Sequence, residues 1–307
     1  MGVYIMRITN NLITQNIITN LQQNMQKIAD LQQEISSGQK IKLIGDDPPS
    51  LWQAMSLKEK LLYTEQHNRN IDDGLLWLNE ADRALDSANQ ILQKTQDLAR
   101  AGANLDSGVV DLTALTTEVD HLIDQMLDVT NTRAGERYLF AAYHKGEKPF
   151  LKTGENEAEE VIFNPALPEE VLGLAEREIL PQSTEEVSFN GQEIFLEGDI
   201  FSSLFTLRNA LAEKDKEKIS QCITSLSAAQ DLILQARATT GAKTSRLDQV
   251  KEGLAGQQLH GQEFLTALSG TEITRATTEL AACTLAYQAT LASTATIGQM
   301  SLVNFLR

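Results

Sequence analysis

The sequence predicts a mainly α-helical protein, an elongated bundle of long helices formed by the N- and C-terminal regions, with a small β-rich inserted domain. Several long segments repeat apolar residues at alternating spacings of three and four, the pattern of a helix with one buried side. Only 6 of the 307 residues are Pro and only 5% are aromatic, a composition that favours helices over an all-β fold. Between residues 151 and 200 Gly, Pro and Glu replace this periodicity, so we place the insert there.

These changes along the sequence predict five segments. Two assembly segments at the ends enclose two parts of a helical core, and the core encloses the outer insert. The segments are residues 1–45 (N-terminal assembly segment), 46–150 (N-terminal part of the helical core), 151–200 (β-rich outer insert), 201–265 (C-terminal part of the helical core) and 266–307 (C-terminal assembly segment).

The first predicted helix ends near Gly38, because Gly readily takes the left-handed conformation that follows many helices. The second begins where Asp47 can accept an amide hydrogen bond as N-cap and Pro48 occupies a position that needs no amide donor. Apolar residues of this second helix repeat every seven positions. They are Ile71, Leu78, Leu85 and Leu92, and Trp77, Ala84, Ile91 and Leu98 widen the pattern.

Two further segments show the same alternation and complete the predicted bundle. Each presents an apolar seam that needs a partner helix. Cys222 and Cys283 both fall at apolar positions of helical patterns, and we interpret them as small core residues rather than as a disulfide. The two seams are Leu112, Leu115, Val119, Leu122, Met126 and Val129, and Ile219, Cys222, Leu226, Ala229, Ile233 and Ala236.

The insert is predicted to contain strands and to face water. Asn190 and Gly191 lie between short alternating runs and predict a two-residue hairpin with Val187 opposite Ile194. A further strand is expected at the Val-Ile-Phe run of residues 161–163. Residues 152 to 199 contain 13 acidic and 2 basic side chains, so this part of the chain carries −11 of the formal net charge of −16.

The terminal segments have almost no charged residues, although both keep helical periodicity. Residues 8–26 contain none, and between residues 273 and 306 only Arg275 and Glu279 are charged. Because a solvent-facing helix normally carries Lys and Glu, we expect these faces to be covered by identical copies, whose neutral surfaces do not repel one another. A helix pair buried within its own monomer is the alternative. The predicted assembly interface is Ile17, Leu21, Ile28, Leu31, Ile35, Ile273, Leu280, Tyr287 and Leu291.

The composition argues against several function classes. A formal net charge of −16 without clustered Lys or Arg is unfavourable for binding nucleic acid. No apolar run is long enough for membrane insertion, and the first residues lack the pattern of a cleavable secretory signal. Taken alone, these features predict a cytoplasmic protein.

No residue pattern predicts an enzyme, a catalytic residue, a cofactor or a metal. The histidines lack the paired spacing of zinc sites and are expected at the surface, and pairs of adjacent acids are interpreted as caps and solvated faces. We find neither a phosphate-binding glycine loop nor a nucleophile elbow. The histidines are His67, His121, His144 and His260, and the pairs of adjacent acids are residues 46–47, 72–73, 159–160 and 185–186.

Short motifs along nearly the whole chain occur in the order of a known family. They are residues 6–10 (Met-Arg-Ile-Thr-Asn), 35–41 (Ile-Ser-Ser-Gly-Gln-Lys-Ile), 46–48 (Asp-Asp-Pro), 69–73 (Arg-Asn-Ile-Asp-Asp), 131–141 (Asn-Thr-Arg-Ala-Gly-Glu-Arg-Tyr-Leu-Phe-Ala), 149–150, 241–247 and 301–306. In this order they resemble the flagellin superfamily and, within it, the hook-filament junction proteins. The family usually has Gly where this chain has Ala142. The start of the family matches Met6, so residues 1–5 are expected either to be an extension or to result from a wrongly assigned start codon, with Met6 as the true start.

The resemblance implies a non-enzymatic adaptor between the flagellar hook and the flagellin filament. It implies export through the flagellar type III channel without a cleavable signal, and hence an extracellular location in the flagellum. It also implies terminal segments that are disordered in the monomer and pair as helices on assembly, and an acidic insert on the outside. The implied partners are neighbouring copies, the adjacent hook-associated junction protein, flagellin and an export chaperone that holds the C-terminal region, with no nucleic acid and no membrane insertion.

Three other interpretations remain open. The first is flagellin itself, which shares the terminal helices, although residues 46–48, 138–141 and 301–307 favour the junction proteins. The second is a cytoplasmic coiled-coil scaffold, supported only by the seams and the acidic charge. The third is a metal-dependent hydrolase that uses the Glu-rich insert.

Overall fold

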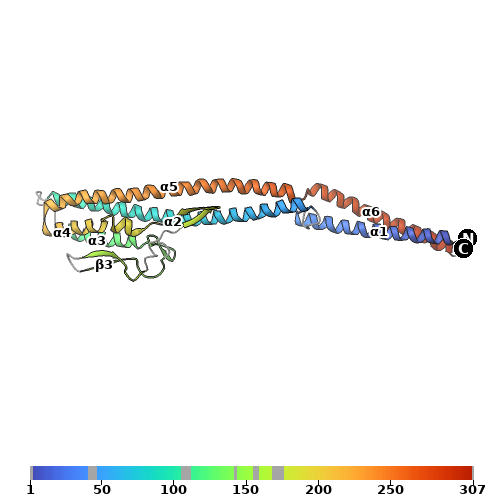
Figure 1. The fold of residues 1–307 in the computed structure, drawn as a ribbon, viewed down its shortest axis with the longest axis horizontal. Coiled ribbons are helices and arrows are strands. Elements are labelled where there is room, and N and C mark those ends of the chain that lie inside the picture. Colours follow the sequence, from blue (N-terminus) through green and yellow to red (C-terminus); the bar gives the residue numbers. More distant parts are fainter. Residues whose placement is uncertain are drawn as a thin grey trace. The chain divides into compact units, whose positions relative to one another are not determined.

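The fold is mainly helical, with small antiparallel strand pairs between the third and fourth helices, as the sequence predicts (Figure 1). The computed structural model describes residues 3–40, 47–104, 112–141, 144–154, 159–167 and 176–305, so Asp46 and Ala142 lie outside it. The helices are α1 (Val3–Ser37), α2 (Pro48–Ala103), α3 (Leu112–Thr130), α4 (Ile200–Glu213), α5 (Lys216–Ser269) and α6 (Ile273–Phe305). The strands are β1 (Arg133–Ala134), β2 (Arg137–Tyr138), β3 (Phe150–Thr153), β4 (Glu160–Phe163), β5 (Glu176–Leu180) and β6 (Ser183–Glu186), followed by the π-helix η4 (Gln192–Leu196).

The chain packs into two compact units. The two longest helices, α2 and α5, contribute to both. Unit 1 consists of residues 1–63 and 257–307, and unit 2 of residues 64–256. The boundary therefore falls inside α2 and inside α5. The five-segment division expected from the sequence stays a prediction.

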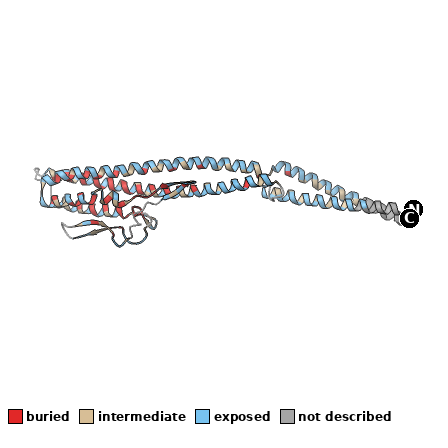
Figure 2. Cartoon of the chain, in the orientation of Figure 1, coloured by how far each residue is buried: buried red, intermediate tan, exposed pale blue. Residues whose placement is uncertain are grey.

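The core of unit 2 is built from the predicted seams, which confirms them. Leu78, Leu85 and Leu92 of α2 are fully buried, as is Met126 of α3. On α5 the seam from Ile219 to Ile233 is buried as well. In Figure 2 the buried residues gather on these helices and on α4. Unit 2 therefore holds a continuous hydrophobic core of the kind that stabilises a domain without help.

The predicted boundary between the first two helices is also confirmed. Gly38 follows α1 with φ +67°, and its amide donates to the Glu34 carbonyl at 2.9 Å. α2 begins at Pro48. The Asp47 carboxylate accepts the Ser50 hydroxyl at 2.6 Å and the Ser50 amide at 3.4 Å, which is how an N-cap satisfies the first turn of a helix.

The strands form three separate two-stranded antiparallel sheets. β1 pairs with β2, β3 with β4 and β5 with β6. In the second sheet Phe150 lies opposite Phe163, and the predicted strand at residues 161–163 is confirmed as part of β4. The hairpin of β5 and β6 reaches α2, where the Glu178 carbonyl accepts a hydrogen bond from Asn70 Nδ2 at 2.8 Å.

The predicted hairpin at Asn190 and Gly191 is wrong. Asn190 pairs with Ala141 instead, and its side-chain oxygen accepts the Gln192 amide at 3.0 Å, which starts the helical turn of η4. Gly191 is required for a different reason, because a Cβ there would lie 2.6 Å from Phe140 Cβ. The Asn-Gly pair therefore allows close backbone approach and a helix start, two uses that a local pattern does not distinguish from a turn.

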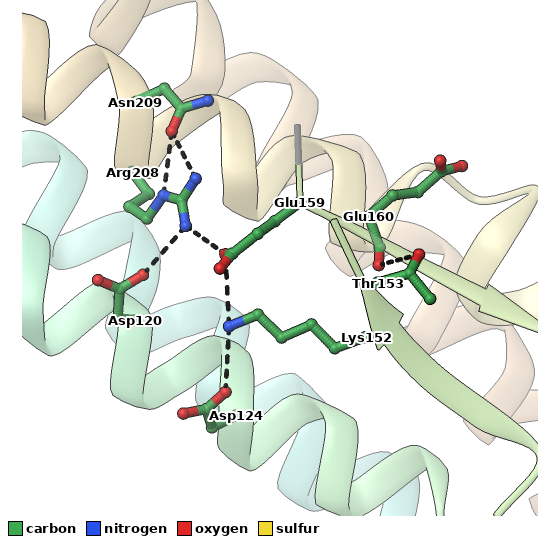
Figure 3. Close-up of polar contacts among 8 residues, drawn as sticks. All are labelled: Asp120, Asp124, Lys152, Thr153, Glu159, Glu160, Arg208 and Asn209. Carbon is green, nitrogen blue, oxygen red and sulfur yellow. Dashed lines mark hydrogen bonds and ion pairs between the residues drawn. The ribbon is translucent and has the colours of Figure 1, made fainter. Parts of the chain in front are cut away.

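The expectation that the whole insert faces water is wrong at Glu159. This carboxylate pairs with Arg208 of α4, and its Oε2 lies 3.4 Å from Lys152 Nζ (Figure 3). Lys152 and Arg208 also reach Asp124 and Asp120 of α3, each at 3.5 Å. Burial raises the pKa of Glu159, but the hydrogen bond from Arg208 and the two cations outweigh it and hold the pKa below its usual value.

Two further surface predictions are wrong beside the β5–β6 hairpin. Glu185 is buried and its Oε2 lies 2.8 Å from Arg246 NH1 of α5. His67 of α2 is buried as well, with Nδ1 3.4 Å from the Glu178 carbonyl. Both are covered because the hairpin lies against the long helices, a tertiary contact that neither residue signals in the sequence.

Candidate assembly surface on the terminal helices

The predicted interface residues of α1 lie on the side that packs against α6. Within unit 1 the two helices run side by side (Figure 1). The half-buried positions of α1 follow spacings of three and four, which marks a narrow seam. No α1 side chain whose burial is described is fully buried. The predicted residues Ile17, Leu21, Ile28, Leu31 and Ile35 are all half-buried.

On α6 the structure separates the predicted residues into two groups. Leu280 and Tyr287 are half-buried in the seam, whereas Ile273 is 58% and Leu291 44% exposed. Ala276 is the buried position near the start of the helix. The outer faces are not covered by the rest of the described chain, contrary to the alternative of a pair buried in its own monomer. Whether the nine residues form an assembly interface stays a prediction.

Unit 1 has no core of large side chains among its described residues. Its buried hydrophobic residues are Ala54 and Ala276. Twelve of the fifteen large apolar residues that are exposed in the described chain belong to unit 1, although unit 2 is the larger unit. They are Leu12, Ile18, Met25, Trp52, Met55, Leu62, Tyr63, Leu259, Phe264, Ile273, Leu285 and Leu291, which we call the outer apolar residues.

This exposure leaves a large hydrophobic gain unrealised. Burying a Leu or Met side chain contributes roughly 1.5–3 kcal/mol, and aromatic side chains bury more area. Ordering each residue of an isolated helix pair costs on the order of 1 kcal/mol of backbone entropy. Unit 1 therefore has a weak drive to fold alone and a strong one to fold against a partner.

Threonine hydroxyls on α6 are satisfied by the helix itself. Thr277, Thr284, Thr290 and Thr294 each donate to the carbonyl four residues earlier, at 2.7 to 2.8 Å. Burying a hydroxyl without a partner is unfavourable, but a hydroxyl that is already bonded has little left to lose. The surfaces of α6 that carry such threonines can therefore be covered by another helix without new hydrogen bonds.

The whole formal net charge of the chain lies on unit 2. Residues 1–63 and 257–307 contain 8 Lys and Arg and 8 Asp and Glu, so unit 1 has no formal net charge. Unit 2 contains the other 18 basic and 34 acidic residues and carries the full −16. Copies that meet through unit 1 avoid the repulsion that unit 2 surfaces would produce.

A backbone joint fixes where the α1–α6 pair begins. Gln39 and Gly270 form an antiparallel bridge, flanked by hydrogen bonds from the Lys40 amide to the Ser269 carbonyl at 2.8 Å and from the Thr271 amide to the Gly38 carbonyl at 3.0 Å. These bonds use main-chain groups that the helix ends would leave unpaired. The joint therefore holds α1 and α6 in register without side-chain specificity.

Part of the exposed apolar surface of unit 1 lies on α2 and α5, where the sequence does not predict it. Within unit 1 the two helices approach closely, because Leu61 Cδ2 lies 2.8 Å from the position a Gly261 Cβ would take. In the same unit, Trp52 of α2 is 71% and Phe264 of α5 is 56% exposed. Residues 51–57 contain no charged side chain, as is also true of long stretches of the terminal helices. A run of seven uncharged residues is too short to predict an exposed surface by itself.

Other candidate sites find no geometric support in the described residues. No group of three His, Cys, Asp or Glu there could hold a metal ion. No described helix combines the length and apolar character that a membrane crossing requires. His121 and His260 are exposed, Cys222 is buried and Cys283 half-buried.

The N-terminal part of the chain is similar to known proteins. Residues 8–145 match the family model of the bacterial flagellin N-terminal helical region. The flagellin of Clostridium tyrobutyricum is 28% identical over 127 residues, 41% of this chain. That match spans 34% of the flagellin, about a third of its length.

The fold is shared with solved flagellar hook-associated proteins. A putative flagellar hook-associated protein from Vibrio parahaemolyticus has a TM-score of 0.62 at 18% identity, covering 73% of this chain and 100% of that one. The flagellar junction protein FlgL from Legionella pneumophila has a TM-score of 0.56 at 13% identity, covering 72% and 100%. At these identities the likeness establishes the fold.

Proposed function

We propose that this chain is a non-enzymatic structural subunit of the bacterial flagellum that joins the hook to the flagellin filament. One observation carries the proposal: the described residues of unit 1 form no core of large side chains and expose twelve large apolar residues, and the unit has no formal net charge. Such a surface is built to be covered by neighbours. The flagellin-like N-terminal region and the fold shared with hook-associated proteins support the flagellum as the assembly in which those neighbours occur.

Assembly would couple folding to association. Because the α1–α6 pair buries only a narrow seam, its helices gain most of their burial from neighbouring copies. Subunits in solution would then stay apart, since ordering the terminal segments is repaid only at the growing end. The proposal includes terminal segments that are disordered before assembly.

The proposed partners are neighbouring copies, the adjacent hook-associated junction protein and flagellin. An export chaperone is proposed to hold the C-terminal region before passage through the flagellar type III channel. The proposed location is extracellular, in the flagellum. The acidic unit 2 supports this arrangement, because surfaces with like charge favour solvent over contact with one another.

Deletion of the gene from its source bacterium tests the proposal. We expect hooks without attached filaments, with flagellin released to the medium as monomers. Restoring the chain should restore attached filaments, whereas restoring an unrelated flagellar gene should not. Filaments still attached to hooks in the deletion strain would contradict the proposal.

A flagellin filament subunit is the second candidate, favoured by the identity to flagellins over the N-terminal region. The same deletion separates the two. Loss of the filament protein itself, with no flagellin in the medium, would support the filament subunit.

A further inference from the structure

A groove on unit 2 has an apolar floor that the core does not explain. It encloses about 520 Å³ between α5 and the segment that leads from β6 into η4. Phe189, Ile194, Leu232 and Ala236 form its apolar part, and polar residues that include Glu186, Glu193 and Lys243 line the rest. Leu232 is 42% exposed there, in a unit whose helices otherwise bury nearly all their large apolar side chains. The groove is therefore a place where unit 2 offers hydrophobic contact.

One end of the groove is electrically balanced. Lys243 Nζ lies 3.7 Å from the Glu186 carboxylate and 5.2 Å from the centroid of the Phe189 ring. This cation is thus shared between an anion and an aromatic face. An uncharged side chain can lie here without leaving a lone charge behind.

Only three large apolar residues are exposed in the described part of unit 2, and they provide an internal comparison. Leu76 lies on α2, whereas Leu232 and Leu234 lie on α5 at 42% and 43% exposure. Of the two on α5, Leu232 lines the groove and Leu234 does not. Because these two leucines are nearly equally exposed on one helix, comparing them distinguishes an effect of the groove from a general effect of surface hydrophobicity.

We propose that this groove binds unit 1 of a second copy of the chain, with Trp52 of that copy inserted between α5 and η4. The inference rests on the proposed function, because it assumes an assembly in which copies contact one another. Charge favours this occupant: unit 2 with −16 repels another unit 2, whereas unit 1 has no net charge.

The local chemistry of the second copy fits the groove. Trp52 is 71% and Met55 57% exposed, and a spacing of three residues places them on one side of α2. Residues 51–57 carry no charge, so this side brings none into the groove. Ala54, between them in sequence, is buried within unit 1. An aromatic side chain inserted into a pocket is the usual anchor of a protein interface.

The contact is heterologous, so it can propagate. Each copy would use unit 1 to fill a neighbour's groove and keep its own groove free for the next copy. Contacts of this kind build rings or helical arrays, whereas a groove filled by an identical groove would stop at a dimer. A subunit of a tube needs the first arrangement.

Two matched substitutions on α5 test the groove. Leu232→Glu places a charge on the apolar floor, and Leu234→Glu places the same charge two residues away at the same exposure. In cells that carry each variant as the only copy, we expect Leu232→Glu to lower the amount of chain in sheared hook preparations at least tenfold. Leu234→Glu should stay within twofold of the unsubstituted chain.

Folding is checked on the purified monomers. Both variants should keep the circular dichroism spectrum and the thermal midpoint of the unsubstituted chain to within a few degrees, since both positions are exposed. Equal loss of assembly in the two variants, or none in Leu232→Glu, would overturn the proposal.

Substitutions in α2 test the occupant. Trp52→Ala should lower incorporation by about tenfold, whereas Leu76→Ala, at an exposed large apolar residue of the same helix in unit 2, should change it less than twofold. Because Trp52 and Leu232 would act in one contact, combining Trp52→Ala with Leu232→Glu should be no worse than the more severe single variant. Fully multiplicative losses would overturn the pairing.

Photo-crosslinking identifies the occupant directly. A benzophenone amino acid at position 232 should, in sheared appendages from cells that express two differently tagged copies, join both tags through a peptide that contains Trp52. A crosslink to flagellin, to another protein or to unit 2 of a second copy would overturn the proposal. So would no crosslink in appendages that contain the chain. Failure of the proposed function gives a different result, namely appendages that lack the chain altogether.

Discussion

The two units use the same long helices for opposite purposes. In unit 2, α2 and α5 bury leucine and isoleucine seams, and the unit as a whole carries the net charge of the chain. In unit 1 the continuations of these helices bury one alanine, Ala54, and expose residues such as Trp52 and Phe264. The difference shows that the stability of a helix is set mainly by what packs around it and less by its intrinsic helix propensity.

The cause lies in the number of partners. In unit 2 the helices α3 and α4 and the β3–β4 sheet pack on one another and add their apolar sides to the core. In the described part of unit 1, α1 and α6 pack mainly on each other. Two helices can bury one narrow seam, which leaves the other sides open.

Hydrogen exchange on the purified monomer should show the largest difference between the units. Amides of residues 71–92 in α2 are expected to be protected by the global stability of unit 2, on the order of 5 kcal/mol or more. Amides of residues 17–35 in α1 should exchange at least a thousandfold faster. Equal protection would show that unit 1 is already folded and would contradict coupled folding.

Matched leucine truncations should separate the units by several kcal/mol. Leu78→Ala removes a fully buried side chain and should destabilise unit 2 by about 2–5 kcal/mol in urea unfolding. Leu280→Ala truncates a half-buried seam residue and should change that transition by less than about 0.5 kcal/mol. A comparable loss in both variants would mean that the two units unfold together.

Two glycines of unit 2 should respond in opposite directions. Gly191→Ala places a Cβ 2.6 Å from Phe140 Cβ and should cost about 1–3 kcal/mol. Gly253→Ala meets no atom within 4 Å on the exposed side of α5 and should stabilise by about 0.5–1 kcal/mol. Thermal unfolding of both variants measures the contrast, and a neutral Gly191→Ala would refute the close approach.

Acid should weaken unit 2 through Glu159. Because its pKa is lowered in the folded chain, its stabilising contribution is full above the pKa of the unfolded chain, about 4.3, and is lost as the pH falls through the folded value. Glu159→Gln should cost about 1.5 kcal/mol at pH 7 and reduce the acid dependence. Glu176→Gln, an exposed acid of β5, is the control and should leave both unchanged.

Several elements were predictable because their cause is local. Gly38 and the Asp47-Pro48 pair mark helix ends through backbone conformation and capping, which depend on few residues. The heptads of α2 were predictable because repeated spacing shows which side is buried. The seam residues of the candidate surface were found in the same way.

The failures have tertiary causes. Glu159, Glu185 and His67 look like surface residues, but strands from a distant part of the chain cover them. Gly191 looked like a turn because an Asn-Gly pair serves both turns and close contacts. Trp52 was missed because a single exposed aromatic residue has no period to reveal it.

By itself, the sequence determined the helical class, the seams and the lack of charge at both ends, because periodicity and composition are properties of contiguous residues. The tertiary structure decided which sides stay uncovered. It separated the half-buried Leu280 from the exposed Leu291, although both belong to one predicted seam. Exposure depends on what packs against a side chain, and that is set by residues far away in the chain.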